Sequence, residues 1–335
     1  MIEERLRNLV ISGLGCELRK EGELLKVISK ENEQQMFYIV SPRNLEQVIL
    51  TGECLITTGA LRLLLENNVD VVFVEHVAPK FFARMVRNDN QRITELWKKQ
   101  LLLSFEKKME IAKEIEECGI YNKIRLLKML EKNRDLKLKE EIECLQLSMG
   151  RIKQSSSIAQ IMGVEGEATE TYFAALRKVI PFEFGFVRRE RHPPRDPINS
   201  LLGYGYTILA SRVEYAVLRA GLNPYEGIIH SSYDNRTALC FDLIEEFRQV
   251  IVDRVILTMI VQHQISVEDF ELTPAMCMIK EKKRKEFLNA LYTRMEAKHK
   301  YEEMELSYLD IIFAQAKKLA KAIGENEKYR GFRWV

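Results

Sequence analysis

The amino-acid sequence predicts an α+β protein, with a small β-rich N-terminal domain over residues 1–85 and an all-α C-terminal domain over residues 86–335. Up to about residue 75, apolar runs are short, rich in Val, Ile and Leu, and divided by turn residues, which is typical of strands. From about residue 88, apolar residues recur every three or four positions, which is typical of helices. A chain of 335 residues also exceeds one ordinary core, which favours two domains.

The N-terminal domain contains five runs of strand length. They are LRNLVIS (6–12), CELRK (16–20), LLKVIS (24–29), MFYIV (36–40) and LEQVIL (45–50). The breaks between them carry Gly13, Gly15, Gly22 and Ser41-Pro42, which are turn residues. A helix is predicted over 60–68, capped by Thr57 or Thr58, and DVVFVE (70–75) reads as one more strand.

The rest of the chain predicts helices alone. The expected helices cover 94–119, 121–149, 158–179, 198–220, 240–264 and two more between 273 and 323. Gly221 suits the end of the fourth helix, and the basic stretch KEKKRKEF is expected at the start of the last. The first two helices are dense in Lys and Glu, and we interpret them as solvated faces with i,i+4 pairs.

The overall charge carries no argument for a nucleic-acid partner. The 51 basic and 49 acidic residues give a net charge of +2, so only a local cluster of cations could supply such an argument. One cluster lies in the loop PFEFGFVRRERHPPRDP, which holds Arg188, Arg189, Arg191 and Arg195. Arginine binds phosphate oxygens through paired donors, although a solvated basic loop is the equal alternative.

Cysteine usage and hydropathy predict a cytoplasmic protein with no membrane span. The six cysteines are scattered and form no CxxC pair, which disfavours a zinc ribbon and fits a reducing compartment. The most apolar run, VIVDRVILTMIV, is broken by Asp253 and Arg254. The first residues also lack the pattern of a cleaved signal peptide.

Three side chains are candidate ligands for a divalent metal. His230 follows a turn made by Asn223-Pro224 and Gly227, so it lies on a loop of a helical scaffold. Glu165 stands between Gly163 and Gly166, where we expect a tight turn to begin a helix. Glu245 lies on a predicted helix. Two carboxylates and an imidazole suit Mg²⁺ or Mn²⁺.

Ordinary structural roles are the alternative for each candidate. A lone histidine is more often packed or solvated than ligating. Asp242 and Glu245, three apart on one helix face, could simply favour the helix N-terminus, as could Glu165. Against this, Glu245 borders the apolar side of its helix, and a carboxylate there needs a partner such as a cation.

An ordered series of segments resembles the CRISPR-associated integrase family of the spacer-acquisition step. IMGVEGEATETYF resembles the family's glutamate motif, and RDPINSLLGYGYTILASRVEYAVLRAGLNPYEGIIH its long helix running into the histidine. ALCFDLIEEFR resembles its final acidic motif, and NLEQVILTGECLITTGALRLLLENNVDVVFVE its strand–helix–strand segment. The resemblance covers about 45–75 and 158–248; residues 90–150 and 255–335 carry no recognised motif.

The resemblance implies a metal-dependent DNA endonuclease and integrase that inserts protospacer DNA into the CRISPR array. Glu165, His230 and Glu245 are implied metal ligands, and Asp242 a further acidic position near the site. A free DNA 3′-hydroxyl would attack the repeat DNA by transesterification, and water in its place would make the site a nuclease. Arg248 is a weaker candidate for DNA contact than the arginine loop.

The resemblance also implies partners: double-stranded DNA, a second copy of the chain bound through the N-terminal domain, and a small ferredoxin-like CRISPR-associated protein bridging two dimers. Two other functions stay open at this point. A catalytically silent DNA-binding scaffold of the adaptation complex would bind DNA but give no products with Mg²⁺ or Mn²⁺. A repair nuclease would cleave branched DNA and ignore repeat sequence.

Overall fold

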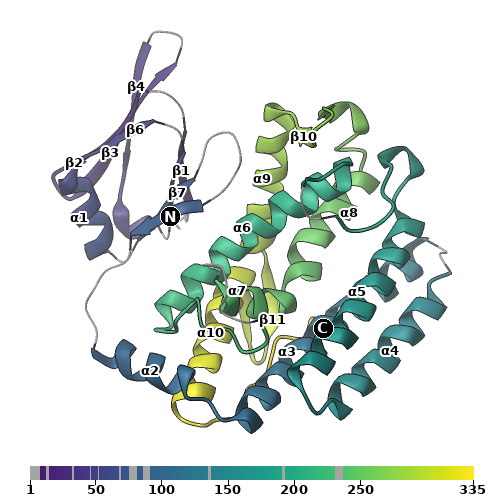
Figure 1. The fold of residues 1–335 in the computed structure, drawn as a ribbon. Coiled ribbons are helices and arrows are strands. Elements are labelled where there is room, and N and C mark those ends of the chain that lie inside the picture. Colours follow the sequence, from purple (N-terminus) through teal and green to yellow (C-terminus); the bar gives the residue numbers. More distant parts are fainter. Residues whose placement is uncertain are drawn as a thin grey trace. The chain divides into compact units, whose positions relative to one another are not determined.

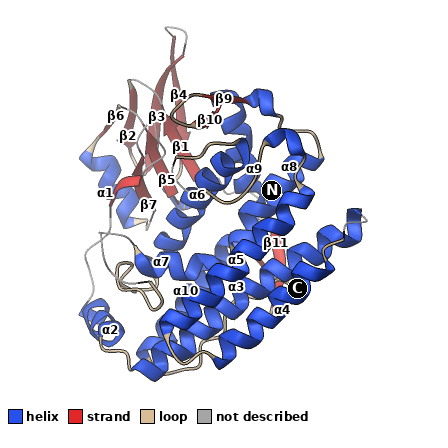
Figure 2. Cartoon of the chain, turned by 45° about the vertical axis from the view of Figure 1, so that its right-hand side comes forward, coloured by secondary structure: helices blue, strands red, loops and turns tan. Residues whose placement is uncertain are grey.

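The computed structural model describes residues 8–12, 15–31, 34–45, 47–51, 53–67, 69–74, 81–85, 91–134, 137–190, 193–230 and 237–335. The chain divides into two compact units, Met1–Asn90 and Gln91–Val335. The first is β-rich and the second mostly helical, which confirms the predicted fold class (Figures 1 and 2).

In its described residues, the N-terminal unit contains two four-stranded sheets, the α-helix α1 and a 3₁₀ turn over Pro42–Asn44. The elements are β1 (Asn8–Ser12), β2 (Cys16–Glu21), β3 (Leu24–Glu31), β4 (Gln34–Val40), β5 (Gln47–Thr51), β6 (Cys54–Ile56), α1 (Thr58–Glu66), β7 (Asp70–Val74) and β8 (Phe81–Met85). The sheet orders are β1-β5-β7-β8 and β4-β3-β2-β6, so β4 lies at an edge. All expected strands form, while β6 and β8 were not predicted.

Apolar side chains of both sheets meet α1 in one core. Leu18 and Leu25 from one sheet, Val48 and Val71 from the other, and Leu64 from α1 are all buried. Helix α1 begins as predicted, because the Thr57 hydroxyl accepts a hydrogen bond from the Ala60 N–H.

The C-terminal unit is built on long helices. They are α2 (Gln91–Leu101), α3 (Phe105–Arg134), α4 (Lys139–Gln154), α5 (Ile158–Val179), α6 (Pro197–Arg219), α7 (Ala238–Leu243), α8 (Arg254–Val261), α9 (Glu281–Glu296) and α10 (Tyr308–Gly324). Helices α3, α4 and α5 pack side by side, and α10 packs against α6 (Figures 1 and 2). Among the described residues, no helix is long and apolar enough to span a membrane.

The prediction of an unbroken all-α domain is wrong in detail. Two small antiparallel hairpins also form: β9 (Phe270–Leu272) with β10 (Cys277–Ile279), and β11 (Lys298–Tyr301) with β12 (Met304–Ser307). The second hairpin turns at Glu302, which has a positive φ of 53° without being glycine or asparagine, so its sequence carries no ordinary turn signal.

Helix boundaries also differ from the prediction. Helix α3 continues through Gly119. The missing side chain there lets Glu245 approach, whose carbonyl oxygen lies 3.3 Å from where a Cβ would be. The breaks fall instead at residues 102–104 and between Arg134 and Lys139, so the expected helix over 121–149 is divided between α3 and α4. The basic stretch KEKKRKEF opens α9, the first helix of the final pair rather than the second.

The segment 240–264 is not one regular helix. Helix α7 ends at Leu243, a 3₁₀ turn follows over Ile244–Glu246, and a π-helical turn over Gln249–Asp253 leads into α8. Such turns are frequent at functional sites because they rotate side chains away from the regular helical faces. The directions of the acidic side chains at 242, 245 and 246 therefore follow from these turns rather than from one regular helix.

Candidate active site

Four separated segments bring acidic, basic and imidazole side chains together inside the C-terminal unit. Helix α5 supplies Glu165, the loop before α7 supplies His230, the 3₁₀ turn supplies Glu245, and α3 supplies Lys123. The Lys123 Nζ lies 3.5 Å from Glu165 Oε1. Charges on both Glu165 and Glu245 act on the His230 imidazole, so the three predicted side chains share one electrostatic environment.

Glu165 does not lie in a first helical turn, as the sequence analysis expected. Helix α5 begins at Ile158, where the Ser157 side chain accepts from the Gln160 N–H, so Glu165 is in its third turn. The carboxylate accepts a 2.5 Å hydrogen bond from the Thr169 hydroxyl. Burial would raise the pKa of Glu165, but Lys123 and this hydrogen bond outweigh burial and lower it. Its role is therefore not that of a helix-dipole acid.

Asp242 is fully buried and organises the loop that ends at His230. Its carboxylate accepts backbone N–H bonds from Ile228, Ile229 and His230, at 2.6, 3.1 and 3.1 Å. It also lies 2.7 Å from the His230 Nδ1. A carboxylate beside Nδ1 favours the proton on that nitrogen, so in the neutral imidazole Nε2 keeps its lone pair.

The same hydrogen bond sets the protonation behaviour of His230. The bond to Asp242 raises the pKa of His230, burial opposes this, and the charges of Asp242, Glu245 and Glu165 add to the rise. A carboxylate that fixes the ring and its tautomer is the usual support for a metal-binding imidazole. Asp242 therefore acts on His230 by holding its ring and the backbone of its loop. The face that Asp242 and Glu245 were expected to share lies across the junction of α7 with the 3₁₀ turn rather than within one regular helix.

Glu245 and Glu246 point into different surroundings. Glu245 forms a 3.0 Å ion pair with the Arg248 guanidinium and packs over Gly119 of α3. Glu246 accepts hydrogen bonds from the Tyr329 hydroxyl and the Phe332 N–H, both at 2.7 Å. Burial raises the pKa of Glu246 to about 8. Of these two glutamates, Glu245 is the one on the side of Glu165 and His230.

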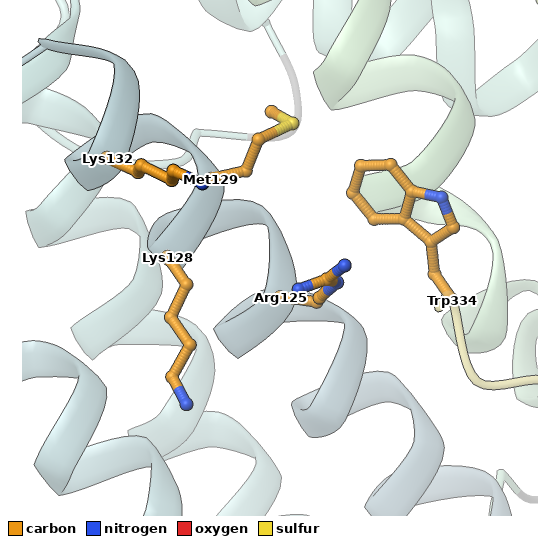
Figure 3. A pocket seen from close by; sticks show the side chains of 5 residues that line it. All are labelled: Arg125, Lys128, Met129, Lys132 and Trp334. Carbon is orange, nitrogen blue, oxygen red and sulfur yellow. The ribbon is translucent and has the colours of Figure 1, made fainter.

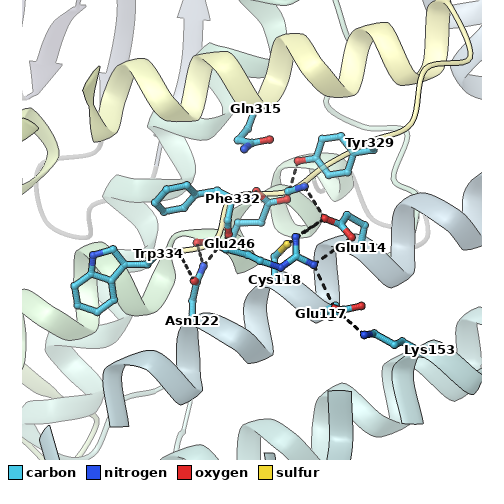
Figure 4. A network of polar contacts seen from close by, with 12 residues as sticks. Glu114, Glu117, Cys118, Asn122, Lys153, Glu246, Gln315, Tyr329, Phe332 and Trp334 are labelled. Atoms are coloured by element: carbon cyan, nitrogen blue, oxygen red, sulfur yellow. Dashed lines mark hydrogen bonds and ion pairs between the residues drawn. The ribbon is translucent and has the colours of Figure 1, made fainter. Parts of the chain in front are cut away.

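The chain's C-terminal segment covers Glu246 and ties it to α3 (Figure 4). The Asn122 amide donates to the carbonyls of Glu246 and Phe332, at 2.8 and 3.0 Å, and its oxygen accepts from the Trp334 N–H. The Phe332 ring stacks on Phe247 with centroids 5.4 Å apart. The 3₁₀ turn that carries Glu245 is thus held from behind by residues almost ninety positions later.

Sequence reasoning missed two buried charged residues of α3, Glu116 and Lys123. They are seven residues apart, hence on one helix face. Burial alone would lower the pKa of Lys123. The negative charges of Glu165, Glu245 and Glu116 outweigh burial, and the pKa of Lys123 is raised. Burial and the charges of Glu245 and Glu165 raise the pKa of Glu116, whose Oε2 has no hydrogen-bond partner among the residues that the structure describes. The interpretation of α3 as a solvated face is wrong here; charged residues within an apolar stripe were the available signal.

The arginines predicted to contact DNA have different surroundings. Arg248 is largely buried: its guanidinium lies 4.8 Å from the centre of the Tyr206 ring and pairs with Glu245. Arg189 bonds to the Asn199 side chain at 2.9 Å, so it supports the start of α6. Arg188 is exposed and pairs with Glu190, and Arg195 is exposed. Arg191 lies outside the described residues.

The donor atoms suit a hard divalent cation, although they are not arranged as a closed cage. Among the described residues, no three His, Cys, Asp or Glu side chains converge at metal-binding distances. Glu165 and Glu245 instead pair with Lys123 and Arg248. Two carboxylates, an imidazole with Nε2 available, and the orphaned Glu116 oxygen form a donor set of the kind Mg²⁺ and Mn²⁺ bind.

Comparisons with known proteins agree with the fold. Residues 9–293 match the family model described as CRISPR associated protein Cas1. The chain is 30% identical over 332 residues to CRISPR-associated endonuclease Cas1 1 of Methanospirillum hungatei, covering 98% of this chain and 99% of that protein.

Two solved structures share the fold. A casposase bound to integration product superposes with a TM-score of 0.84 at 23% identity, covering 97% of this chain and 93% of the casposase. A Cas6-RT-Cas1–Cas2 complex has a chain that matches with a TM-score of 0.80 at 24% identity, covering 100% of this chain and 37% of that longer one.

A β-rich unit followed by a mostly helical unit is the architecture that this chain shares with these solved structures, and its curated relatives are CRISPR-associated endonucleases. The chain belongs to the Cas1 family, whose members are the endonucleases and integrases of spacer acquisition. The resemblance seen in the sequence is thereby confirmed, and so is the predicted class of enzyme.

Proposed function

We propose that the helical unit joins a DNA 3′-hydroxyl to a phosphodiester of repeat DNA, with Mg²⁺ or Mn²⁺ held by Glu165, His230 and Glu245. The observation that carries the proposal is that the charges of Glu165 and Glu245, from two other segments, act on the His230 imidazole, whose ring Asp242 holds. A bound divalent cation would stabilise negative charge on the phosphodiester oxygens.

The chain's own cations supply the remaining electrostatics. Lys123 and Arg248 neutralise Glu165 and Glu245 in this structure, which keeps two carboxylates in a buried site at tolerable cost. Once Glu165 and Glu245 bind a divalent cation, the side chains of Lys123 and Arg248 are released from them and can contact phosphate oxygens. Arg248 retains an Nε without a partner, and stacking on Tyr206 fixes its plane. Arg188 and Arg195 are the candidates for contacts farther along the DNA.

We propose that two copies pair through the N-terminal unit and that a small ferredoxin-like protein bridges two such dimers. Support comes from β4, an edge strand whose successive residues Met36, Phe37, Tyr38 and Ile39 are 40%, 63%, 53% and 46% exposed. An exposed apolar edge strand is a liability unless a partner covers it. The matching chain of the Cas6-RT-Cas1–Cas2 complex, as described, assembles with Cas2.

A strand-joining assay tests the proposed reaction. A short duplex with free 3′ ends and a repeat-containing plasmid are incubated with Mg²⁺ or Mn²⁺, and joined products are counted. We expect joining by the natural protein and its loss in Glu165→Ala and His230→Ala. Joining at the normal rate by either variant would refute the site. Binding without any product would support a scaffold, and cleavage of branched DNA regardless of repeat sequence would support a repair nuclease.

A further inference from the structure

A cationic pocket lies on a different face of α3 from the candidate active site. Its volume is about 400 Å³, and it is lined by Arg125, Lys128, Met129, Lys132 and Trp334. Figure 3 shows Arg125 reaching from α3 toward the Trp334 indole across the pocket, with Lys128 and Lys132 on the same helix. We propose that this pocket binds an unpaired DNA strand, with a base stacked on Trp334 and phosphates held by the three cations.

The spacing of the cations suits a chain of phosphates. Positions 125, 128 and 132 follow one side of a helix, about 4.5 and 6 Å apart along its axis. All three side chains are exposed, and among the described residues none of them pairs with a carboxylate. Acidic side chains are likewise absent from the residues that line the pocket. A strand carrying one charge per nucleotide would neutralise this row.

Two further arginines increase the positive charge at the pocket. Arg254 contacts the sulfur of Met129, and the Arg294 guanidinium lies 5.7 Å from the centre of the Trp334 ring. The partners of Arg294 are neutral, namely the Val250 carbonyl at 2.9 Å and the Tyr308 hydroxyl at 3.0 Å. Burial lowers the pKa of Arg294, and the like charge of Arg254 acts in the same direction. An anion would relieve this repulsion.

Trp334 is held in place as a stacking surface should be. Its backbone N–H donates to Asn122 at 2.8 Å, and the preceding Arg333 pairs with Glu114 at 2.6 Å. Fixed aromatic faces bind unpaired bases with little sequence preference. A duplex hides its base faces in the stack, so the pocket fits a single strand. Arg125 is two residues from Lys123 of the candidate site on α3. Side chains two positions apart do not face each other on a helix, so the strand would be held on another side of α3 from the reacting DNA.

The two tryptophans of the chain make this inference directly measurable. Trp97→Phe leaves Trp334 as the sole tryptophan. Trp334→Phe leaves Trp97 as the sole tryptophan and serves as the matched control, because Trp97 is not part of the pocket. Both proteins are titrated with a short oligothymidylate in EDTA, and fluorescence is recorded. We expect saturable quenching of Trp334 and no change for Trp97. Absence of Trp334 quenching, or equal quenching by a blunt duplex or by polyglutamate, would overturn the assignment.

Salt dependence tests the cations separately from the indole. Replacing Arg125, Lys128 and Lys132 by Gln should reduce the slope of log affinity against log salt by about 2 for a single strand. Replacing the exposed Lys282, Lys285 and Lys300 by Gln removes the same charge elsewhere and should leave the slope unchanged. Equal reductions in both triple variants would refute a specific phosphate row. Trp334→Ala should weaken binding about tenfold, with Trp334→Phe weaker in effect.

The inference rests on the proposed function only in taking DNA as the substrate. The binding measurements contain no metal, whereas the strand-joining assay requires one. If the pocket fails to bind the oligonucleotide while joining proceeds, the pocket assignment falls and the proposed function stands. If the pocket binds the oligonucleotide and joining is absent, the pocket assignment stands and the proposed function falls.

Discussion

Glu245 and Glu246 are neighbours in the chain but belong to two different regions of the helical unit. Glu245 faces Arg248 and the buried cations of the candidate site, whereas Glu246 is sealed under the C-terminal segment by Tyr329 and Phe332. A 3₁₀ turn makes this separation, because consecutive residues in it point about 120° apart. The comparison teaches that the surroundings of Glu245 suit a charged ligand, whereas the surroundings of Glu246 hold the turn that carries Glu245 in place.

The largest expected effect comes from breaking the C-terminal region. Phe332 is 2% exposed and stacks on Phe247. Phe332→Ala should lower the free energy of unfolding by about 3–5 kcal/mol, since a buried ring is replaced by a cavity. Phe182→Ala is the matched control, because Phe182 is 94% exposed and its loss should cost less than about 0.5 kcal/mol. Urea unfolding measures both, and similar values for the two variants would contradict the role given to the C-terminal segment.

The second prediction sets the two glutamates against each other. Glu245→Gln should slow strand joining by about 10²–10³-fold, as loss of a charge-stabilising group does. Glu246→Gln should leave the rate within a few-fold of the natural protein, because its carboxylate contacts the C-terminal segment. Single-turnover rates with Mn²⁺ measure this. An equal loss of rate in both variants would erase the distinction between the two regions.

A pH-dependent effect of intermediate size is expected at Asp253, beyond Arg248 and Tyr206. Burial raises the pKa of Asp253 from 3.8 to about 6, against hydrogen bonds from Tyr172 and Tyr206. Between these values the folded protein holds a proton that the unfolded chain has lost, so this group's contribution to stability falls as pH rises from 3.8 to 6 and stays low above it. The fall amounts to at most about 3 kcal/mol.

Asp253→Asn tests this sign, because the amide cannot ionise. The difference in unfolding free energy, variant minus natural protein, should therefore increase as pH rises from 4 to 6 and then level off. Urea unfolding at several pH values gives this difference, in which the other titrating groups cancel. A difference that is constant with pH, or one that decreases, would show that Asp253 is not held protonated.

The smallest effect is expected from the residue that orients the imidazole. Asp242→Asn removes one of the two oxygens that hold His230 and its loop, and should weaken Mn²⁺ binding about 10–100-fold. Glu183→Gln, at an exposed carboxylate, is the control. Calorimetric titration with Mn²⁺ checks the affinity. Unchanged affinity in Asp242→Asn would mean that His230 does not need this support.

The predicted elements held best where their signal was local. Periodic apolar residues located α5 and α6, Thr57 marked the start of α1, and Gly221 marked the end of α6, because capping and periodicity depend on neighbours within a few positions. The strands β11 and β12 were missed because their turn uses Glu302. The 3₁₀ and π turns of 244–253 were missed because no short-range pattern announces them.

By itself, the sequence determined the two-part organisation, the family and the three candidate ligands Glu165, His230 and Glu245. Only the tertiary structure decided that Asp242 supports His230, that Glu246 faces away, and that Lys123 and Glu116 belong to the candidate site. The physical reason is burial. A charged side chain takes its role from the partners that replace water around it, and here those partners come from helices and a C-terminal segment tens to hundreds of positions away.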